Sequence, residues 1–444
     1  MRASDLALIL QGEFKGSNTE IRRFSIDSRK VKEGETFIAI KGERRDGHSF
    51  VEEAFKKGAV GAIVERDFNP VSGRFIIKVE STFKALYRIA LFKREQFKGV
   101  VTAVAGSAGK TTTKELVYHL ISYVDNAYRS EGNFNSRIGL PLTLANMDIT
   151  SGYAIFELGA SQKGDVLKLT KLVKPKVRII TAIGEEHMET FGSLKEIIEG
   201  NGEIFHNFGS EDTAIIPYYL RGTYKLPPSK VITFGTDGNL QAENIRLSLE
   251  GTSFIFKGQE FTIKVLNKSI VDCSLAAFGF LIASGYDPRE FRDRLGEFLP
   301  PKGRMNILNF GDFFIIDDTY NANPLSMKNA LKTLGDLNTT SKKIVVIGDM
   351  LELGNKSETL HREIGCFTAQ CGIDFAIFFG SDMIFAYEEY TKRGGRGIML
   401  KKREDVLEEI LKWLKDKNII LLKGSRGMQM DKFIEELKEI IYYG

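Results

Sequence analysis

The sequence predicts an α/β protein of several domains with parallel sheets, and three observations support this prediction. Apolar strand-like runs alternate with helical stretches through the last third of the chain, which is typical of a parallel sheet covered by helices on both faces. A glycine-rich loop near residue 106 follows an apolar run and precedes a helical pattern. The 444 residues also exceed the roughly 100–200 residues of a usual domain. We expect a small mixed α/β domain (1–80), a central parallel-sheet domain (81–303) and a C-terminal doubly wound domain (304–444).

In the first 80 residues, three short runs rich in Val, Ile and Phe are bounded by turn residues, which is typical of strands. The predicted strands are Thr36–Ile40, Val60–Glu65 and Phe75–Val79. An amphipathic stretch predicts a short helix over Ser49–Lys57. Apolar residues at helical spacing predict a longer helix over Ser81–Phe97 with Ser81 as its N-cap, and we place the first domain boundary before it.

The middle of the chain begins with a strand, a loop and a helix, predicted over Val100–Ala105, Gly106–Gly109 and Thr111–Tyr123. Apolar runs there predict buried parallel strands over Tyr153–Phe156 and Val177–Ile183. Phe254–Val265 is expected to form a peripheral hairpin and Asp272–Ser284 a buried helix. The C-terminal strands are predicted at Phe313–Ile316, Lys343–Ile347, Phe375–Phe379, Gly397–Leu400 and Ile419–Leu422. The helices between and after them are predicted at Pro324–Leu334, Glu358–Cys371, Met383–Lys392, Arg403–Lys415 and Gln429–Tyr442.

Composition limits the classes of partner. The net charge of +4 is too small to favour nucleic acid, and no apolar run approaches the ~20 residues of a membrane helix. The three cysteines, Cys273, Cys366 and Cys371, match no metal-ligand spacing, so we expect buried free thiols in a reducing compartment. We therefore expect a cytoplasmic monomer that neither inserts into a membrane nor binds nucleic acid.

The most informative motif is the Ala-Gly-Ser-Ala-Gly-Lys-Thr-Thr-Thr string that begins at Ala105. Between a strand and a helix, such a loop can direct backbone N–H groups and the helix N-terminus at phosphate oxygens. Lys110 is expected to reach the β- and γ-phosphates and Thr111 to bind Mg²⁺, although Val104 stands where the strict pattern has glycine. The central domain is therefore predicted to be phosphate-loop ATPase-like. The loop residues expected to bind ATP are Gly106, Ser107, Ala108, Gly109, Lys110, Thr111 and Thr112.

Two polar residues that follow buried strands are candidates for the same site. Glu157 closes an apolar run and offers the carboxylate that Mg²⁺ prefers; otherwise it is a solvated acid at a strand end. His187 lies beyond the next predicted strand, where ligands gather in open α/β sheets; otherwise it is a surface histidine. We favour the functional role for both residues.

Other strings accompany the loop in a characteristic order. They are Asp27–Arg29 and Gly42–His48, then Glu131–Asn135, Ile138–Pro141, Glu157–Ala160 and the His187 segment, and finally Asp317–Pro324, Gly348–Gly354 and Lys423–Arg426. Together with the loop they span nearly the whole chain and resemble the Mur ligase family of ATP-dependent amide ligases. The Asp-Asp-Thr-Tyr-Asn-Ala-Asn-Pro string resembles the branch of that family that adds D-alanyl-D-alanine.

The resemblance implies a role for each of the three domains. The first domain would bind a UDP-N-acetylmuramoyl-tripeptide through Ser28, Arg29, Arg45, Asp46, Gly47 and His48. The central domain would bind ATP, with further contacts from Asn133, Asn135, Asp318 and Asn321. The C-terminal, Rossmann-like domain would bind D-alanyl-D-alanine through Asn323, Ser425 and Arg426. Lys110, Glu157, His187 and Arg304 would be the catalytic residues; for Asp318 and Asn321, turn formation before Pro324 is the alternative.

Two positions depart from the family pattern. Asn201 stands where the family has a carbamylated lysine that helps to hold a second Mg²⁺. An amide oxygen can bind Mg²⁺ without adding charge, so Thr111, Glu157, His187 and Asn201 are the expected metal ligands, and bicarbonate should not stimulate catalysis. Cys273 stands where the family has an asparagine that contacts adenine.

The implied reaction activates a carboxylate as an acyl phosphate, which the amine substrate then attacks. The alternatives are a related ligase that adds a single amino acid, such as a folylpolyglutamate synthase, and a phosphate-loop switch or motor. The Asn-Ala-Asn-Pro string disfavours the first alternative. A guanine-nucleotide switch would need an Asn-Lys-x-Asp string, which the sequence lacks.

Overall fold

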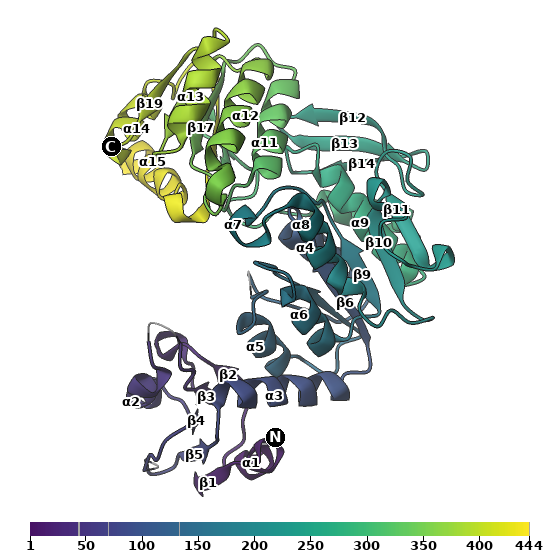
Figure 1. Ribbon diagram of the computed structural model, residues 1–444, viewed down its shortest axis with the longest axis vertical. Helices are drawn as coiled ribbons and strands as arrows, with labels where there is room; N and C mark the ends of the chain where they lie inside the picture. The colour runs from purple at the N-terminus through teal and green to yellow at the C-terminus, as the bar shows by residue number, and fades with distance from the viewer. Residues whose placement is uncertain (43–44, 70, 133, 444) are drawn as a thin grey trace. The chain divides into compact units, whose positions relative to one another are not determined.

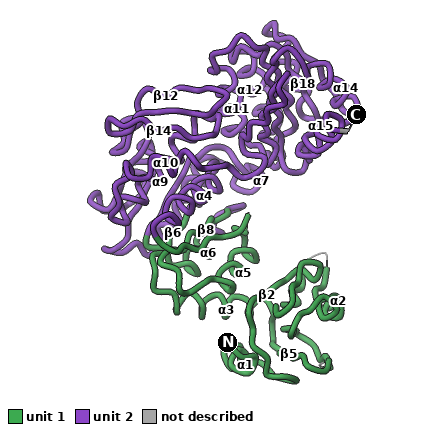
Figure 2. Tube along the Cα trace, turned by 180° about the vertical axis from the view of Figure 1, so that it is seen from behind, with its two compact units in different colours: residues 1–103, 125–159, 167–176 green, residues 104–124, 160–166, 177–444 purple. Residues whose placement is uncertain are grey.

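The structure is a computed structural model that describes residues 1–42, 45–69, 71–132 and 134–443 (Figure 1). The chain forms two compact units (Figure 2). Unit 1 comprises Met1–Ala103, Asp125–Gly159 and Leu167–Lys176, and unit 2 comprises Val104–Val124, Ala160–Val166 and Val177–Gly444.

The first sheet lies in unit 1 and has the strand order β1-β5-β4-β3-β2. Its strands are β1 (Glu13–Gly16), β2 (Arg23–Ser25), β3 (Glu35–Ile38), β4 (Gly61–Val64) and β5 (Phe75–Lys78). The last four strands are parallel, and β1 runs antiparallel to β5. The structure confirms the three strands predicted in this region.

Helices bury both faces of this sheet. Because successive side chains of a strand point to opposite faces, Ile77 packs with α1 (Ala3–Leu10) and α3 (Thr82–Gln96), while Ile76 packs with α2 (Val51–Lys56). The Ser81 hydroxyl accepts a hydrogen bond of 3.3 Å from Lys84 N, which confirms the predicted N-cap of α3. The predicted short helix at Ser49–Lys57 is a 3₁₀ turn (Gly47–Phe50) that continues into α2.

The second sheet has the order β11-β10-β9-β6-β8-β7. Its strands are β6 (Val100–Ala105), β7 (Ala127–Arg129), β8 (Tyr153–Glu157), β9 (Val177–Ile180), β10 (Thr213–Pro217) and β11 (Val231–Phe234). The associated helices are α4 (Lys110–Ile121), α5 (Gly139–Ala145), α6 (Asp165–Val173), α7 (Met188–Phe191), α8 (Leu194–Gly202) and α9 (Ile270–Ala283). Parallel pairs join β7 to β8, and β10 to both β9 and β11. The parallel sheet predicted for this region is confirmed.

One predicted strand of this sheet is too long. The apolar run predicted a strand over Val177–Ile183, but β9 ends at Ile180. The next residues bond to the glycine-rich loop instead: Thr181 N donates to Ala105 O at 2.9 Å, and Ala182 O accepts from Ser107 N at 2.7 Å. Thr181 is buried and Ala182 and Ile183 are partly buried, so the apolar run continues past the residue at which the backbone changes partner.

A small antiparallel sheet in unit 2 contains β12 (Glu243–Ser248), β13 (Gly251–Phe256) and β14 (Gln259–Ile263), in that order. The predicted hairpin at Phe254–Val265 corresponds to the β13–β14 pair. After α9 and a turn, the chain forms a 3₁₀ segment (Pro288–Phe291) and then the short helix α10 (Arg292–Gly296). The hairpin prediction is confirmed, with one extra strand at its edge.

The third sheet has the order β15-β16-β20-β17-β18-β19 and lies in unit 2. Its strands are β15 (Asn306–Asn309), β16 (Phe314–Asp318), β17 (Lys343–Gly348), β18 (Phe375–Phe379), β19 (Gly397–Leu400) and β20 (Ile419–Lys423). Its helices are α11 (Pro324–Asp336), α12 (Ser357–Gln370), α13 (Met383–Lys392), α14 (Arg403–Leu411) and α15 (Asp431–Tyr443). All pairs are parallel except β15–β16, so the doubly wound prediction is confirmed.

Helices α11 to α15 lie around this sheet (Figure 1), and successive side chains of its strands point to opposite faces. Ile344 and Val346 of β17 pack with Ile410 of α14 and Ile434 of α15. Helices α11, α12 and α13 pack side by side, and α11 and α13 contact the sheet at β17 and β18. The shared edge formed by the carboxyl ends of these parallel strands is where ligands usually bind.

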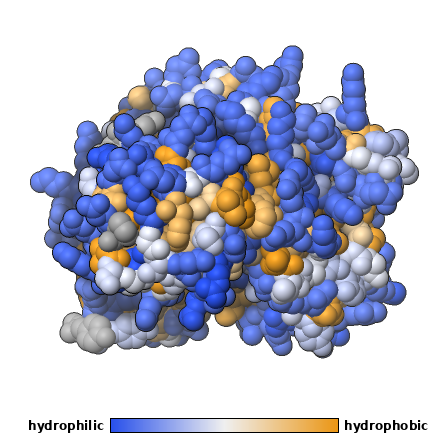
Figure 3. Space-filling model, turned by 90° about the horizontal axis from the view of Figure 1, so that it is seen from below, coloured by the Kyte–Doolittle hydropathy of each residue, from blue (hydrophilic) through white to orange (hydrophobic). Residues whose placement is uncertain are grey.

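Charged and polar residues cover most of the face drawn in Figure 3, with apolar side chains between them in smaller groups. Among the described residues, no helix has both the length and the apolar character to cross a membrane. The three cysteines are free, but only Cys273 is buried. The prediction of burial is therefore wrong for Cys366 and Cys371, which lie near the end of the amphipathic helix α12 and stay partly exposed.

Candidate active site

The glycine-rich loop lies between β6 and α4, as the sequence predicted. Gly106 has a φ of 134° and Gly109 a φ of 85°, values that side chains rarely adopt. A Cβ atom at Gly106 would lie 2.2 Å from Thr181 Oγ1, and one at Gly109 would lie 3.1 Å from Cys273 Sγ. The path of the backbone therefore requires glycine at both positions.

Hydrogen bonds to the backbone of the glycine-rich loop fix its conformation. Two amides that we expected to face phosphate, those of Ser107 and Ala108, donate instead to Ala182 O at 2.7 and 3.2 Å. The Thr181 hydroxyl donates to Ala108 O at 2.7 Å. Helix α4, with the half-buried Thr112 in its first turn, begins directly after the loop, and the N-terminus of a helix is suited to an anion.

Lys110 lies at the first position of α4, mostly buried beside a carboxylate. Its ammonium donates to Gly106 O and lies 3.5 Å from Glu186 Oε2. Glu186 is only 5% exposed, and its other oxygen, Oε1, makes no hydrogen bond with a described residue. A buried acceptor without a partner is costly, so this position suits a cation or a bound water. The sequence analysis did not single out Glu186.

Two side chains that follow the second sheet in sequence contact the loop. Arg304 Nη2 donates to Thr111 Oγ1 at 2.9 Å, and Asn323 Nδ2 donates to Ser107 O at 3.3 Å. Arg304 was predicted to approach the phosphates. In the structure its guanidinium forms a hydrogen bond with the hydroxyl of Thr111, which we expected to bind Mg²⁺. Residues separated by about 200 positions in the chain are thus brought together at one loop.

Glu157 lies at the end of β8 in unit 1 and is 2% exposed. Its Oε1 accepts a hydrogen bond of 2.7 Å from Asn135 Nδ2. Gly159 N donates to Asn135 O at 2.8 Å, which holds the segment that carries the amide. The alternative that Glu157 is a solvated acid is therefore wrong. Asn133, the other predicted ATP contact of this segment, lies outside the described residues.

His187 adopts a left-handed backbone conformation with a φ of 45°, just before α7. Its Nδ1 lies 2.5 Å from Glu352 Oε2, so we assign a proton to Nδ1. A histidine held in this way presents Nε2 as a lone-pair donor, the arrangement common in metal ligands. Glu352 belongs to the Gly348–Gly354 string, but the sequence did not predict this pairing.

Asn201 is buried in α8, with 1% exposure. Its Nδ2 donates to Ile197 O at 3.0 Å, whereas Oδ1 has no hydrogen-bond partner among the described residues. The oxygen that the sequence proposed as a ligand is thus an unsatisfied buried acceptor, which fits a bound cation. No group of three or more His, Cys, Asp or Glu side chains in the described part of the chain could hold a metal ion by itself. Mg²⁺ commonly completes its shell with waters and substrate phosphates.

Asp318 lies at the end of β16 and forms a buried ion pair. Lys423 Nζ donates to Asp318 Oδ2 at 2.6 Å and to Asn321 O at 2.9 Å. Register pairs Asp318 with Lys423 across β16 and β20, so the sheet itself sets this contact. Asp317, and not Asp318, supplies the local turn bonds, because its Oδ1 accepts from Thr319 N and Oγ1.

The predicted amine-binding residues differ in how much of each side chain remains available. Asn323 caps α11, with Oδ1 accepting from Ser326 N at 2.8 Å. The buried Ser425 hydroxyl donates to Ala322 O at 3.0 Å and accepts from Leu351 N at 2.9 Å. The Arg426 side chain is 65% exposed, so its guanidinium is the accessible group of the three.

Cys273 lies at the start of α9, against the glycine-rich loop. Burial raises the pKa of its thiol to about 11, so the thiol stays protonated at neutral pH. A protonated, buried thiol is a poor substitute for the hydrogen bonds of an asparagine amide.

The predicted UDP-binding residues of unit 1 are engaged with near neighbours. Asp27 accepts from the backbone and guanidinium of Arg29, and this pairing holds the pKa of Asp27 below its usual range. Ser28 Oγ donates to Glu53 Oε2 at 2.8 Å. These bonds fix the 3₁₀ turn at Ser28–Lys30.

A second network surrounds His48, which is buried. Asp46 Oδ1 lies 2.6 Å from His48 Nδ1, Arg66 pairs with the other oxygen of Asp46, and Glu65 N donates to His48 Nε2 at 2.8 Å. A Cβ at Gly47 would lie 2.6 Å from Ile40 O, which explains the glycine. These residues shape a loop in which Arg45 is exposed. Glu43 and Arg44 of the same string lie outside the described residues.

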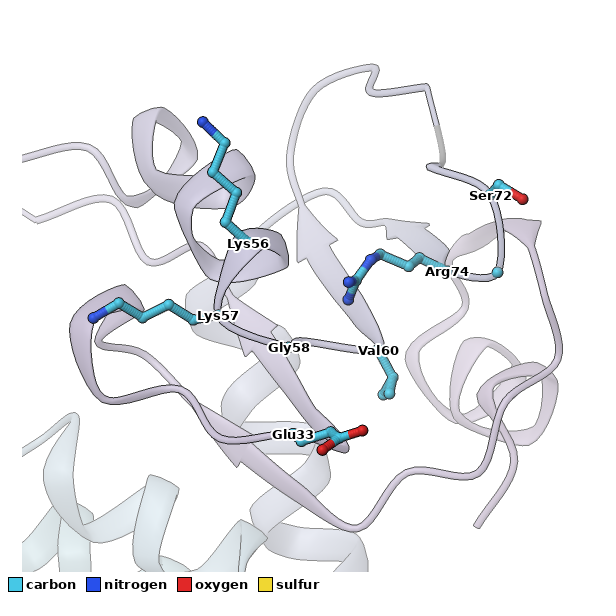
Figure 4. A pocket seen from close by; sticks show the side chains of 8 residues that line it. Glu33, Lys56, Lys57, Gly58, Val60, Ser72 and Arg74 are labelled. Atoms are coloured by element: carbon cyan, nitrogen blue, oxygen red, sulfur yellow. The ribbon is translucent and has the colours of Figure 1, made fainter.

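A shallow cavity of about 400 Å³ lies elsewhere in unit 1 (Figure 4). Its lining residues are Glu33, Lys56, Lys57, Gly58, Val60, Ser72, Gly73 and Arg74. The Arg74 side chain points into this space, whereas the ammonium groups of Lys56 and Lys57 point away from it. None of the predicted binding residues lines this cavity.

Comparison with known proteins supports the resemblance seen in the motifs. The chain matches the family models "Mur ligase family, catalytic domain" over residues 20–94, "Mur ligase middle domain" over 104–281 and "Mur ligase, glutamate ligase domain" over 303–426. It is 34% identical to the UDP-N-acetylmuramoyl-tripeptide–D-alanyl-D-alanine ligase of Bacillus subtilis over 95% of this chain and 94% of that protein.

Two solved structures have the same fold. The crystal structure of MurF from Acinetobacter baumannii matches with a TM-score of 0.88 and 30% identity over 98% of both chains. MurF ligase from Thermotoga maritima, in complex with ADP, matches with a TM-score of 0.80 and 28% identity over 95% of this chain and 98% of that one. Because identity of this level extends over nearly the full length, the chain belongs to the Mur ligase family.

Proposed function

We propose that this Mur ligase uses ATP to join D-alanyl-D-alanine to UDP-N-acetylmuramoyl-tripeptide, a step in the synthesis of peptidoglycan precursors. The observation that carries the proposal is the glycine-rich loop between β6 and α4, which Arg304 and Asn323 contact from a distant part of the chain. The full-length similarity to UDP-N-acetylmuramoyl-tripeptide–D-alanyl-D-alanine ligases supports the choice of this member of the family. The ADP complex of the Thermotoga maritima enzyme supports the choice of ATP.

The reaction has two steps, and each is balanced. An oxygen of the precursor carboxylate attacks the γ-phosphorus of ATP, the bond to the β-phosphate oxygen breaks, and ADP leaves. The dipeptide amine then attacks the carbonyl carbon of the acyl phosphate, loses a proton, and phosphate leaves. Positioning and charge neutralisation supply most of the catalysis in such phosphoryl transfers.

Lys110 and Arg304 are the cations that we assign to the phosphates. Lys110 begins the helix after the loop, and Arg304 lies on the Thr111 hydroxyl beside it. Both are held by protein groups and so lose little freedom when an anion binds, which favours stabilisation of charge that develops on the transferred group. We assign the ribose to Asp318, supported by its fixed orientation against Lys423.

We assign Mg²⁺ binding to Thr111, Glu157, His187 and Asn201. The unsatisfied Asn201 Oδ1 and the Nε2 that His187 presents support this set. The ion would neutralise phosphate charge. Because Asn201 needs no carbamate, bicarbonate should leave the rate unchanged, and stimulation by bicarbonate would contradict this assignment.

We assign the two remaining substrates to opposite ends of the chain. Residues 1–80 would bind the UDP-linked precursor, with Arg45 as the exposed cation and Asp46 and His48 shaping its loop. Residues 304–444 would bind the dipeptide, with Arg426 facing its carboxylate. Residues 81–303 would then form the ATP-binding domain. We further propose that the enzyme works as a monomer in the cytoplasm, where ATP is available.

The test is ATP-dependent phosphate release with UDP-N-acetylmuramoyl-tripeptide and a panel of amines. We expect release with D-alanyl-D-alanine and only background release with single amino acids. Activity with a single amino acid but not with the dipeptide would identify a different ligase of the family. Rapid ATP hydrolysis that needs no carboxylate acceptor would contradict the ligase proposal altogether.

A further inference from the structure

The ring of Tyr320 lies next to two arginines that the proposed function assigns to different substrates. Arg304 Cζ lies 4.1 Å from the ring centroid, and Arg426 Cζ lies 5.7 Å from it. Both distances fall within the roughly 6 Å over which a guanidinium is attracted to an aromatic face. Tyr320 itself was not among the predicted site residues.

We propose that Tyr320 is a positioning residue that holds Arg304 for the phosphates of ATP and Arg426 for the carboxylate of the dipeptide. This inference rests on the proposed function, because the roles of the two arginines come from it. It assigns no substrate contact to Tyr320 and makes its ring the shared support of two cationic groups.

The backbone supports the first half of this arrangement. Tyr320 N donates to Gly303 O at 3.0 Å, so the turn that carries Arg304 is bonded to the tyrosine. Gly303 has a φ of 76°, and a Cβ there would lie 3.0 Å from Tyr320 N. The side chain of Arg304 then extends from this turn to Thr111 Oγ1 at 2.9 Å. Backbone and ring therefore place Arg304 at the glycine-rich loop together.

The second half of the arrangement is fixed by the neighbours of Arg426. Its backbone N donates to Asn321 Oδ1 at 3.0 Å, and Asn321 directly follows Tyr320. Its Nη1 lies 3.3 Å from Asp431 Oδ2. With the guanidinium bounded by a ring and a carboxylate, and with 65% of the side chain exposed, Arg426 can receive an anion without rearranging its backbone.

A ring suits this position because the two neighbours carry like charges. Two guanidinium groups repel each other, and water or a carboxylate between them would either add mobility or neutralise the charge needed for substrate. An aromatic face attracts both cations without consuming their hydrogen-bond donors. The N–H groups that do not bond to Thr111 or Asp431 thus stay available for anionic ligands.

The arrangement predicts a kinetic signature that a residue contacting one substrate would not produce. Removing the ring should weaken two binding sites at once, although Tyr320 contacts neither ATP nor dipeptide in this scheme. A cation–π contact of this kind should change binding by about threefold to thirtyfold. The KM for UDP-N-acetylmuramoyl-tripeptide should stay unchanged, because its proposed binding residues lie in the first 80 residues of the chain, far from Tyr320 in the sequence.

The experiment compares Tyr320→Leu with Tyr320→Phe in the full-length enzyme, measuring kcat and the KM of each substrate by phosphate release. We expect Tyr320→Leu to raise the KM values of both ATP and D-alanyl-D-alanine by about tenfold, and Tyr320→Phe to restore both to within about threefold of wild type. Phe385→Leu is the matched control. It removes the ring 5.1 Å from Arg362 in the same sheet domain, and neither residue was predicted to bind a substrate. It should leave all three KM values unchanged.

Three outcomes would overturn the inference. Wild-type kinetics in a folded Tyr320→Leu enzyme would show that the ring supports neither arginine. A rise in only one KM would show that Tyr320 serves a single substrate. Failure of Tyr320→Phe to restore both would assign the effect to the hydroxyl. By contrast, a wild-type enzyme that releases no phosphate with the dipeptide would refute the proposed function before any variant is compared.

Discussion

The predicted site residues form different kinds of polar contact in the glycine-rich loop region and in the N-terminal region. In the loop region of unit 2, polar side chains bond to partners far away in the sequence, such as Thr111 with Arg304 and His187 with Glu352. In the N-terminal region of unit 1, the partners are closer in the sequence: Asp46 and His48 are 2 residues apart, and Ser28 and Glu53 are 25 apart. Long-range polar contacts assemble chemistry from several segments, whereas local ones set the shape of a loop. We infer that the loop region carries the catalytic step and that the N-terminal region supplies a preformed recognition surface.

The largest expected effect comes from Lys110, which represents the catalytic side of this comparison. Lys110→Met should lower kcat by roughly 10³-fold, because it removes a fixed cation from the transferring phosphate. Lys84→Met, on the exposed face of α3, should not change the rate. Phosphate release measures both variants. A Lys110→Met enzyme that keeps a tenth or more of wild-type activity would refute the assignment.

A glycine with positive φ occurs in each of the two regions, Gly106 in the loop region and Gly73 in the N-terminal region, and substituting each one tests the comparison. At Gly106 a Cβ would strike Thr181, whereas at Gly73, with a φ of 76°, it would meet nothing within 4 Å. Both variants to alanine carry backbone strain, but Gly106→Ala adds an overpacking cost of about 1–3 kcal/mol. We expect urea unfolding to show this larger loss, with a raised KM for ATP. Equal losses in the two variants would mean that the loop can shift to accommodate the methyl group.

The acids of the N-terminal region should produce the smallest effect, and one that depends on pH. The hydrogen bond from His48 holds the pKa of Asp46 below its usual range. A lowered pKa means that stability is present above the unfolded value near 4 and is lost as pH falls through the folded value. We therefore expect Asp46→Asn to be less stable than wild type at pH 7 by under about 1 kcal/mol, with the difference vanishing in acid.

Asp67→Asn is the control for that prediction. Lys78 likewise lowers the pKa of Asp67, so its removal should give a similar pH dependence in urea unfolding. Only Asp46→Asn should also raise the KM for the UDP-linked precursor. If both variants leave that KM unchanged, the loop around His48 does not take part in recognition.

Clear apolar runs that stop at turn residues predicted most of the strands, but not all of them. Strand β18, the partly buried edge strand β19 and helix α13 begin and end at the predicted residues. Strand β10 (Thr213–Pro217) was missed although it is buried. Strand β15 was missed, since Asn306–Asn309 is a half-exposed edge with polar ends. Strand β7 was missed for the same reason, because its three residues are only partly buried.

Within the site, the sequence predicted residues that carry a motif but not the residues that orient them. Glu352 and Lys423 act on His187 and Asp318 through contacts that only the folded chain creates. Lys423 did have a usable signal: like Glu157, it is a charged residue that closes a buried apolar strand. Tyr320 had none, because its significance depends on two arginines more than 100 residues apart.

The most direct test of the account is a crystal structure of the enzyme with Mg²⁺ and a non-hydrolysable ATP analogue. The account predicts that the terminal phosphate lies within hydrogen-bond distance of Lys110 Nζ and of the amides at the start of α4, with Arg304 turned from Thr111 toward the phosphates. The account would be contradicted if the analogue bound elsewhere. It would also be contradicted if, with the analogue bound to an active enzyme, Lys110 Nζ still bonded to Gly106 O and the loop amides to Ala182 O.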